Sequence, residues 1–192
     1  MPDPNPAALD FLLTRRSRPY KTLGQPVPNR AALEPILTAA LRTPDHGKLE
    51  PWRLIVLEAP ALRRLADIVS ARGTALGKSD DDIAKARLAY EISPLAVAVI
   101  EVQKPSDKIP AVEMTYAAGA ACLALLNAAL AAGWGANWLS GWPSHDRGFC
   151  AEALDLADNE TVAGLIHIGT ESATPPDRPR PDLATVTTWV SA

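Results

Sequence analysis

EMTYAAGAACLALLNAALAAGWGANWLSG, residues 113 to 141, is the stretch of sequence that decides the fold. Ala, Leu, Gly and Cys fill almost every position from Ala117 to Ala132, and Asn127 is the only polar interruption. Ala and Leu are the best helix formers, and a helix that is apolar all round must be buried on all sides. Gly133 and Gly135 supply a stop signal at its C-terminal end. A chain of 192 residues cannot easily surround such a helix alone, so we expect a second subunit to help cover it.

A membrane span is the alternative interpretation of this helix, because about 20 apolar residues can cross a bilayer. The run is mostly Ala, however, and it contains Gly119, Asn127 and Gly133 but few Leu, Ile, Val or Phe residues. Glu113 lies just before it, and no cluster of Lys or Arg flanks it on either side. The pattern therefore favours a buried helix at a subunit interface, and we expect no membrane partner.

The composition is that of an ordinary globular protein, with 47% hydrophobic and 21% charged residues. The length predicts one domain covering residues 1–192. A net charge of −3 argues against nucleic acid as a partner. The first ten residues lack the basic and apolar regions of a signal peptide, and Cys122 and Cys150 have neither disulfide nor metal spacing. We expect a soluble cytoplasmic protein without a metal site.

Hydrophobic periodicity predicts helices and strands that alternate irregularly along the chain. Besides the long Ala-rich helix, helices are expected over residues 5–14, 29–41, 59–73, 83–90 and 149–156. Strands are expected over residues 53–58, 95–102 and 162–169, with a short strand or loop at 134–141 and a closing strand at 186–190. Residues 74–82 are expected to form a polar, mobile connector. This order indicates an α+β layer fold with few strands.

Three arginines and a hydroxyl occur within the six residues Arg15-Arg16-Ser17-Arg18-Pro19-Tyr20. Arginine presents a planar fork of donors that suits phosphate or carboxylate. The alternative is a solvated basic helix end, where cations also favour the helix dipole.

No glycine-rich dinucleotide loop, zinc spacing or serine elbow is present in the sequence. The histidines His46, His145 and His167 are far apart, and His167 lies in an apolar strand where a core or interface role is expected. The lack of an acid–base or nucleophile constellation fits either a non-enzyme or an enzyme whose cofactor carries the chemistry.

Four motifs in order resemble the FMN-dependent nitroreductase family. Arg15 to Tyr20, after an N-terminal helix, looks like that family's "RRSxRxY" opening. The loop Thr43 to Trp52 resembles its second motif, "P-S-x-x-N-x-Q-P-W", in the variant of a compact NAD(P)H nitroreductase subgroup with a "PDH…PW" loop. The Asn of the usual form is absent here, and Glu50 stands where Gln is common. The Ala-rich helix ending in Gly-Trp-Gly, residues 138–140 and residues 168–170 complete the resemblance over nearly the whole chain.

The resemblance implies a nitroreductase-like fold with a mostly antiparallel central sheet flanked by helices. It also implies an intertwined homodimer with two FMN molecules in the interface. The Ala-rich helix then becomes the core of the interface, and the arginine cluster becomes a phosphate site.

The same resemblance implies roles for individual residues. The flavin's phosphate, ribityl chain and pyrimidine edge would be held by Arg15, Arg16 and Ser17. The flavin bound mainly by the other subunit would be reached by Arg42 and His46, and the isoalloxazine would be lined by Trp138, Leu139 and Ser140. A C-terminal phosphate contact would come from Arg180, or else from Arg178. The stretch that resembles a nicotinamide-contacting segment is Ala128, Ala129, Leu130, Ala131, Ala132 and Gly133.

The activity implied by the resemblance is a ping-pong oxidoreduction. NADH or NADPH would pass a hydride to the FMN, which would then reduce a nitroaromatic, quinone or similar small acceptor. A non-catalytic flavin or tetrapyrrole carrier on the same scaffold is the alternative, and a structural homodimer without a cofactor is a third. No motif that would select NADH over NADPH is present.

Overall fold

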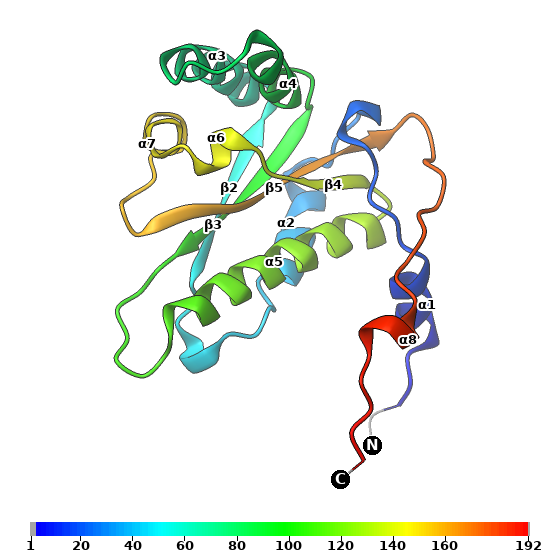
Figure 1. The fold of residues 1–192 in the computed structure, drawn as a ribbon. Helices are drawn as coiled ribbons and strands as arrows, with labels where there is room; N and C mark the ends of the chain where they lie inside the picture. Colours follow the sequence, from blue (N-terminus) through cyan, green and yellow to red (C-terminus); the bar gives the residue numbers. More distant parts are fainter. Residues whose placement is uncertain (1–2, 192) are drawn as a thin grey trace.

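The computed structural model describes residues 3–191, which fold around a five-stranded antiparallel sheet (Figure 1). The strands are β1 (Leu23–Gly24), β2 (Trp52–Glu58), β3 (Leu95–Val102), β4 (Gly135–Leu139) and β5 (Glu160–Glu171). The order is β1-β5-β3-β2, and β4 also pairs with β5. His167 of β5 is the register partner of both Ala96 in β3 and Asn137 in β4. The expected α+β class with a mostly antiparallel sheet is confirmed.

Helices cover both faces of the sheet (Figure 1). The helices of the described residues are α1 (Pro6–Thr14), α2 (Arg30–Ala40), α3 (Ala59–Ala75), α4 (Asp80–Glu91), α5 (Ala111–Ala131), α6 (Trp142–His145), α7 (Arg147–Leu154) and α8 (Leu183–Val186). Two short 3-10 turns, η1 (Tyr20–Thr22) and η2 (His46–Lys48), punctuate the loops. Helices α2 and α5 lie on one face, and α3, α4, α6 and α7 lie on the other.

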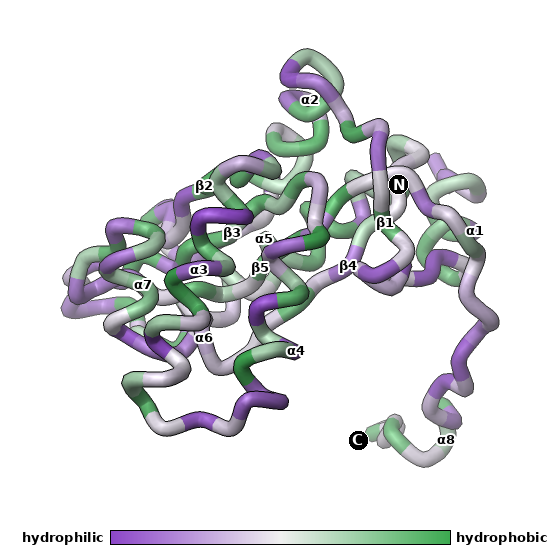
Figure 2. The backbone as a smooth tube through the Cα atoms, turned by 90° about the horizontal axis from the view of Figure 1, so that it is seen from above, coloured by the Kyte–Doolittle hydropathy of each residue, from purple (hydrophilic) through white to green (hydrophobic). Residues whose placement is uncertain are grey.

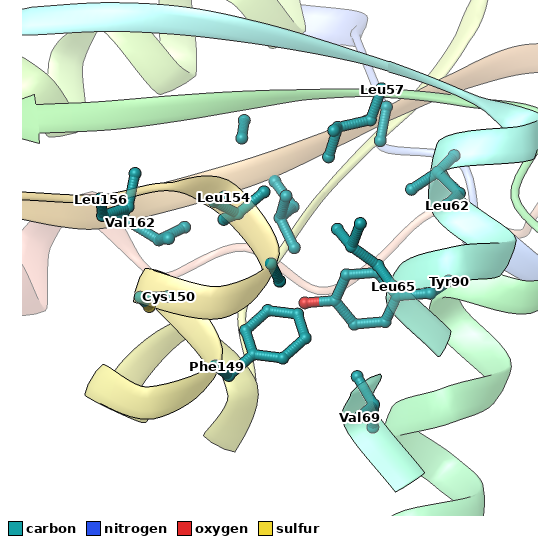
Figure 3. Close-up of a cluster of buried hydrophobic side chains, with 14 of the residues drawn as sticks. Leu57, Leu62, Leu65, Val69, Tyr90, Phe149, Cys150, Leu154, Leu156 and Val162 are labelled. Atoms are coloured by element: carbon teal, nitrogen blue, oxygen red, sulfur yellow. The ribbon is translucent and has the colours of Figure 1, made fainter. Parts of the chain in front are cut away.

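The alternation of side chains along β3 divides the core into two clusters, because successive residues of a strand point to opposite faces. Ala96, Ala98 and Ile100 face α3, α4 and α7, whereas Val97 and Val99 face α2 and α5. Figure 3 shows the first cluster, in which Tyr90 and Phe149 meet edge to face with their ring centroids 5.6 Å apart. The expectation that residues 95–102 form a central buried strand is therefore confirmed.

Within one subunit, helix α5 is buried on one face only, and the other face is the part that a second subunit was expected to cover. Met114, Cys122 and Leu125 are buried against the sheet, whereas Tyr116 on the opposite face is 69% exposed and Leu123 is also exposed. By length and composition α5 could cross a membrane, but 44% of its most apolar window is buried inside the fold. Ala is small enough to populate both a packed and an exposed face, so the composition alone does not reveal the division.

The C-terminal end of α5 forms as its glycines predict. Gly133 adopts a left-handed φ of +85°, and the Trp134 amide donates to the Ala129 carbonyl at 3.0 Å. This closure is a glycine-dependent helix stop. It releases the chain directly into β4, so the predicted short strand at this place is confirmed.

The expected closing strand at residues 186–190 is wrong. Helix α8 ends at Val186, and the residues that follow have no regular structure, with Trp189 87% exposed. β-branched and aromatic residues form a strand only where another strand pairs with them. This C-terminal segment extends away from the sheet, and hydrophobic residues lie near its end (Figure 2).

Helices α4 and α7 begin earlier than expected, and capping explains both starts. Helix α4 begins at Asp80, inside the expected connector, because Ser79 accepts from the Asp82 amide and three aspartates fill the first turn. Helix α7 begins at Arg147 because the Asp146 carboxylate accepts from the Phe149 amide at 2.8 Å.

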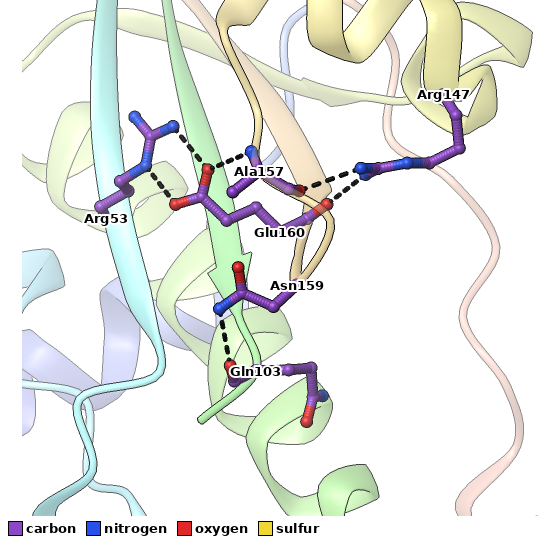
Figure 4. Close-up of polar contacts among 6 residues, drawn as sticks. All are labelled: Arg53, Gln103, Arg147, Ala157, Asn159 and Glu160. Atoms are coloured by element: carbon purple, nitrogen blue, oxygen red, sulfur yellow. Dashed lines mark hydrogen bonds and ion pairs between the residues drawn. The ribbon is translucent and has the colours of Figure 1, made fainter. Parts of the chain in front are cut away.

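A polar network fastens the loop before β5 to β2 (Figure 4). The Glu160 carboxylate accepts from Arg53 Nε at 2.6 Å and Arg53 Nη2 at 2.8 Å, and it also accepts from the Ala157 amide. These hydrogen bonds, led by the one from Arg53, lower the pKa of Glu160. Arg147 donates to the Glu160 carbonyl, and Asn159 donates to the Gln103 carbonyl. All charges in this network have partners.

Candidate functional site

The arginine-rich segment after α1 is held against the sheet rather than free in solvent. The Arg18 amide donates to the Ala136 carbonyl at 2.8 Å, and Asn137 Nδ2 donates to the Arg18 carbonyl at 2.7 Å. Arg18 Nε also lies 2.6 Å from Glu171 Oε2. Strands β4 and β5 thus fix this segment at Arg18.

A cavity of about 530 Å³ opens between this segment, β4 and the C-terminal segment. Its lining residues are Arg15, Arg16, Ser17, Pro19, Tyr20, Asn137, Trp138, Arg178 and Arg180. We call it the arginine cavity. Five of the residues expected to bind a flavin meet there although they come from three distant parts of the chain.

The positive charges of the arginine cavity are only partly compensated. Arg15 Nη2 donates to Ser17 Oγ at 3.1 Å, whereas its Nε is buried without a hydrogen-bond partner among residues 3–191. Arg180 lies 3.4 Å from Asp177, and Arg16 donates to backbone carbonyls. Burial, and then the nearby charges of Arg180 and Arg16, lower the pKa of Arg15. A half-buried cation among other cations favours binding of an anion that accepts several hydrogen bonds.

Trp138 is positioned by the sheet. It pairs in register with Ile166, and its indole lies over Gly164, where a Cβ would come within 2.1 Å of the indole nitrogen. Only glycine at position 164 leaves room for this ring. The aromatic wall of the arginine cavity therefore depends on a residue of the neighbouring strand.

Leu139 and Ser140 line a second cavity of about 280 Å³, which we call the histidine cavity. Tyr20 lines both cavities, so they adjoin each other. The histidine cavity is further lined by Asp82, Lys85, Ala86, Ala89, Tyr90, Gly141, Trp142, Pro143, Ser144, Leu165 and His167. The predicted isoalloxazine contacts are thus divided between two adjoining cavities, with Trp138 in one and its two successors in the other.

His167 is a buried residue, as its apolar strand predicts, and it is only 1% exposed. Its Nδ1 lies 2.7 Å from Ser93 Oγ, and burial lowers its pKa to about 4, so the ring is neutral at pH 7. Three buried polar atoms in this region have no partner in the described part of the chain: His167 Nε2, Trp142 Nε1 and Ser144 Oγ. Buried polar atoms without partners are uncommon and mark a place where a ligand or water can be held.

Arg42 and His46 do not line either cavity. Arg42 borders a shallow depression of about 350 Å³ on the exposed side of α5, beside Leu123 and Asn127. His46 Nδ1 lies 2.7 Å from Glu113 Oε2. Within one subunit, therefore, the second predicted motif lies apart from the first.

Residues 128–133, which are expected to contact nicotinamide, lie in different surroundings. Ala129 is buried in the core, whereas Leu130 and Gly133 line a cavity of about 570 Å³ that also includes Arg15 and Arg16. Ala131 and Ala132 are exposed at the end of α5, and Ala128 is half-buried. The end of α5 therefore lies beside the arginine cavity but does not enter it.

Sequence reasoning missed several residues of this region, namely Tyr20, Asn137, Trp142 and Ser144. Asn137 offered one signal, because it is a polar residue between two strand residues that are otherwise apolar. The described residues contain no group of three or more His, Cys, Asp or Glu side chains that could hold a metal ion.

A protein-family model described as "Nitroreductase family" matches residues 12–170. The chain belongs to the nitroreductase family. It is 32% identical over 163 residues to the Escherichia coli (strain K12) protein "Putative NAD(P)H nitroreductase YdjA", covering 85% of this chain and 87% of that protein. It is 34% identical over 165 residues to a "Putative NAD(P)H nitroreductase" of Haemophilus influenzae, covering 85% and 88%.

Solved structures of nitroreductase-like proteins share the fold. A nitroreductase-like family protein from Bacillus cereus superposes with a TM-score of 0.81 over 100% of both chains at 21% identity. A Desulfovibrio desulfuricans protein, solved as a nitroreductase in complex with FMN, superposes with a TM-score of 0.75 over 99% of this chain and 100% of that chain at 21% identity. The nitroreductase fold of the chain is thus supported over its full length.

Proposed function

We propose that this nitroreductase-family chain is an FMN-dependent oxidoreductase. It takes a hydride from NADH or NADPH and reduces a nitroaromatic, a quinone or a similar acceptor by a ping-pong mechanism. The observation that carries the proposal is the buried, unpaired Nε of Arg15 in a cavity with three further arginines. The names of the Escherichia coli and Haemophilus influenzae relatives and the FMN complex of the Desulfovibrio desulfuricans protein support it.

The residues of the arginine cavity fit the phosphate of FMN. Arg15, Arg16 and Arg180 would supply forked donors, and the hydroxyl of Ser17 would supply another. A phosphate dianion would give Arg15 Nε the partner it lacks within the chain and would relieve the repulsion between the guanidinium groups. Arg178 lines the same cavity and is a further candidate for this contact.

The ring system of the flavin suits the region where the two cavities adjoin. Trp138, Leu139 and Ser140 would line the isoalloxazine, with Tyr20 at the boundary between the cavities. The polar edge of the ring carries both carbonyl acceptors and an N–H donor, so it matches a cavity whose walls contain unpaired polar atoms. Arg15, Arg16 and Ser17 would hold this edge in the arginine cavity, and the ring would extend toward the histidine cavity.

When bound, FMN supplies the centre that accepts and returns the hydride. The chain binds and orients the cofactor, and the guanidinium groups favour the negative charge that reduction adds. The residues that line the arginine cavity include no Asp, Glu or His, so they offer no acid–base pair. The chemistry assigned here needs none from the protein.

The site is completed by a second subunit in this proposal, which takes the protein as an intertwined homodimer. The exposed face of α5 carries a stripe of Val112, Tyr116, Ala120 and Leu123, an apolar surface suited to a partner. Arg42 and Asn127 border the same surface. Arg42 and His46 would then contact the flavin held by the other subunit. We further take the protein to be a single cytoplasmic domain with no membrane or nucleic-acid partner.

The visible spectrum of the purified protein tests the proposal. Protein incubated with FMN and desalted is expected to keep a yellow flavin band, and the band is expected to bleach when NADPH or NADH is added without oxygen. Protein that takes up no FMN would refute the assignment. Protein that binds FMN but is reduced no faster than free FMN would instead indicate the carrier function.

A further inference from the structure

The loop that precedes β2 has an unusual backbone. Gly47, Lys48 and Glu50 all adopt positive φ angles, of 71°, 54° and 49°. Residues other than glycine rarely adopt this conformation, which costs about 1 kcal/mol or more each, and such residues cluster at functional sites. Gly47 itself cannot be replaced easily, because side chains rarely adopt its φ of 71°. The fold thus stores strain in a loop with several exposed polar side chains, one of which contacts a carboxylate of α5.

That group is His46, the first residue of η2, whose side chain is 62% exposed. Two contacts shape the loop around it: Asp45 Oδ2 accepts from the Glu50 amide at 2.9 Å, and the Lys104 ammonium donates to the Leu49 carbonyl. The third contact is different in kind, because it holds the imidazole itself. His46 Nδ1 lies 2.7 Å from Oε2 of Glu113, a residue of the first turn of α5.

We propose that Glu113 is a positioning residue that fixes His46 for contact with the flavin of the partner subunit. An ionised carboxylate can only accept hydrogen bonds, so the proton of this contact belongs to Nδ1. Nε2 is then the ring atom left to meet the cofactor, and its direction is set by Glu113. This inference rests on the proposed function, in which His46 contacts FMN across the dimer.

The location of Glu113 supports this role. It lies in the first turn of the helix whose exposed apolar stripe is the proposed subunit interface, next to Val112 and three residues before Tyr116 of that stripe. Its side chain is 39% exposed in one subunit, and exposed ion pairs contribute little to stability. A partner subunit on this face would exclude water from the pair and strengthen it. The pair of His46 and Glu113 is therefore better explained by a role in the dimeric site than by a contribution to the stability of one chain.

A double-mutant cycle on FMN affinity tests the proposal. Glu113→Ala and His46→Ala are each expected to weaken FMN binding about tenfold, the size of one charge-assisted hydrogen bond. If Glu113 acts through His46, Glu113→Ala will have no further effect in the His46→Ala protein. Equal weakening in both backgrounds, or no weakening by Glu113→Ala alone, would overturn the proposal. Glu34→Ala, which removes an exposed carboxylate paired with Arg30, is the matched control and is expected to leave affinity unchanged.

Two further variants distinguish the orientation of His46 from the charge of Glu113 and from a folding defect. Glu113→Gln keeps an oxygen acceptor for Nδ1, so it is expected to stay within about threefold of wild type. A loss as large as that of Glu113→Ala would contradict a positioning role. Glu113→Asp keeps the charge, but its side chain is one methylene shorter, so the carboxylate lies farther from Nδ1. We expect its FMN affinity to fall as far as that of Glu113→Ala. It therefore replaces Glu113→Ala should that variant fail to fold.

Nitrogen NMR of the apo protein gives a readout that does not need the cofactor. His46, one of three histidines, is expected to show a protonated Nδ1 in the wild type and a mixture of tautomers in Glu113→Ala. An unchanged tautomer would refute the inference. Failure of the wild type to bind FMN would instead refute the proposed function, and the NMR result would still stand on its own.

Discussion

Two groups of arginines in this molecule differ in what surrounds them. At the rim near α7, Arg53 meets Glu160 and Arg72 meets Asp146, each through two hydrogen bonds of 2.6–3.0 Å. In the arginine cavity, Arg15 has a hydroxyl contact, a buried nitrogen without a partner and two arginines as neighbours. The same side chain therefore joins parts of the fold in one place and lacks a carboxylate partner in the other. In our proposal, the partner of an arginine, and not its presence, distinguishes a structural role from a binding role.

The pKa shifts of the two groups of arginines have opposite directions. Hydrogen bonding to carboxylates raises the pKa of Arg53 and Arg72, whereas burial and neighbouring cations lower the pKa of Arg15. Paired arginines are thus stabilised in the charged form by the fold. Arg15 is held charged at a cost, which a bound phosphate would offset.

The sharpest test of this comparison is Arg15→Ala. We expect FMN affinity to fall by about 1.5–3 kcal/mol, the size of hydrogen bonds to a charged group, with little or no loss of folding stability. Titration with FMN and thermal unfolding of the apo protein would measure the two effects. Arg30→Ala is the matched control, because Arg30 is an exposed arginine of α2 that pairs with Glu34. An Arg15→Ala protein that binds FMN normally would remove the distinction between the two groups.

For Glu160→Ala we expect the opposite result, a loss of folding stability with unchanged FMN affinity. The carboxylate is largely buried, and its loss leaves Arg53 without its charged partner, so we expect the free energy of unfolding to fall by about 2 kcal/mol. FMN affinity should stay the same, since Glu160 lines neither cavity. Denaturant unfolding would measure the stability, with Glu34→Ala as the control for an exposed ion pair. A loss of FMN affinity without a loss of stability would contradict the assignment of this pair to the fold.

Acid is expected to lower the stability through two carboxylates and through His167. The pKa values of Glu160 and Asp146 are lowered chiefly by hydrogen bonds from their arginines, so their contribution is complete above the unfolded pKa values of about 4. It is lost as the pH falls through the folded values. Burial of neutral His167 contributes in a separate window, because the unfolded ring takes up a proton below about pH 6.5 and the folded ring does so only near 4.

Urea unfolding between pH 3 and 7 would measure both windows. Stability should decline gently below about pH 6.5 and more steeply below about pH 4.5. Glu160→Gln is expected to flatten only the steeper part, because its amide does not titrate. If stability falls as steeply below about pH 4.5 in this variant as in the wild type, the pair of Arg53 and Glu160 does not stabilise the fold in this way.

Much of the fold follows from local patterns. The β3 run is continuous and apolar, so its central place was predictable, and Asn29 and Gly133 mark the start of α2 and the end of α5 as their chemistry requires. The wrong closing strand shows the limit of such patterns. Residues 186–190 have strand composition, but no strand in the described part of the chain pairs with them.

The site was predictable only in part. The arginine motif and Trp138 could be chosen from the resemblance, and they do meet in one cavity. Leu139 and Ser140 of the histidine cavity were chosen in the same way, but its other walls come from α4, α6, β5 and Tyr20 and could not be anticipated. The strained loop and the contact between His46 and Glu113 were also invisible, since backbone strain and a pairing across 67 positions leave no local mark in the sequence.

Most of the secondary structure, the apolar helix and the residue types of the proposed anion site follow from the sequence, because these depend on propensities and periods within a few positions. Which charges meet depends on the tertiary structure. Arg53 finds its carboxylate 107 positions away and Arg72 finds its own 74 positions away, while Arg15 Nε finds no partner among residues 3–191. Electrostatic compensation depends on distance in space, and distance in space is set by the packing of the sheet and its two helix layers.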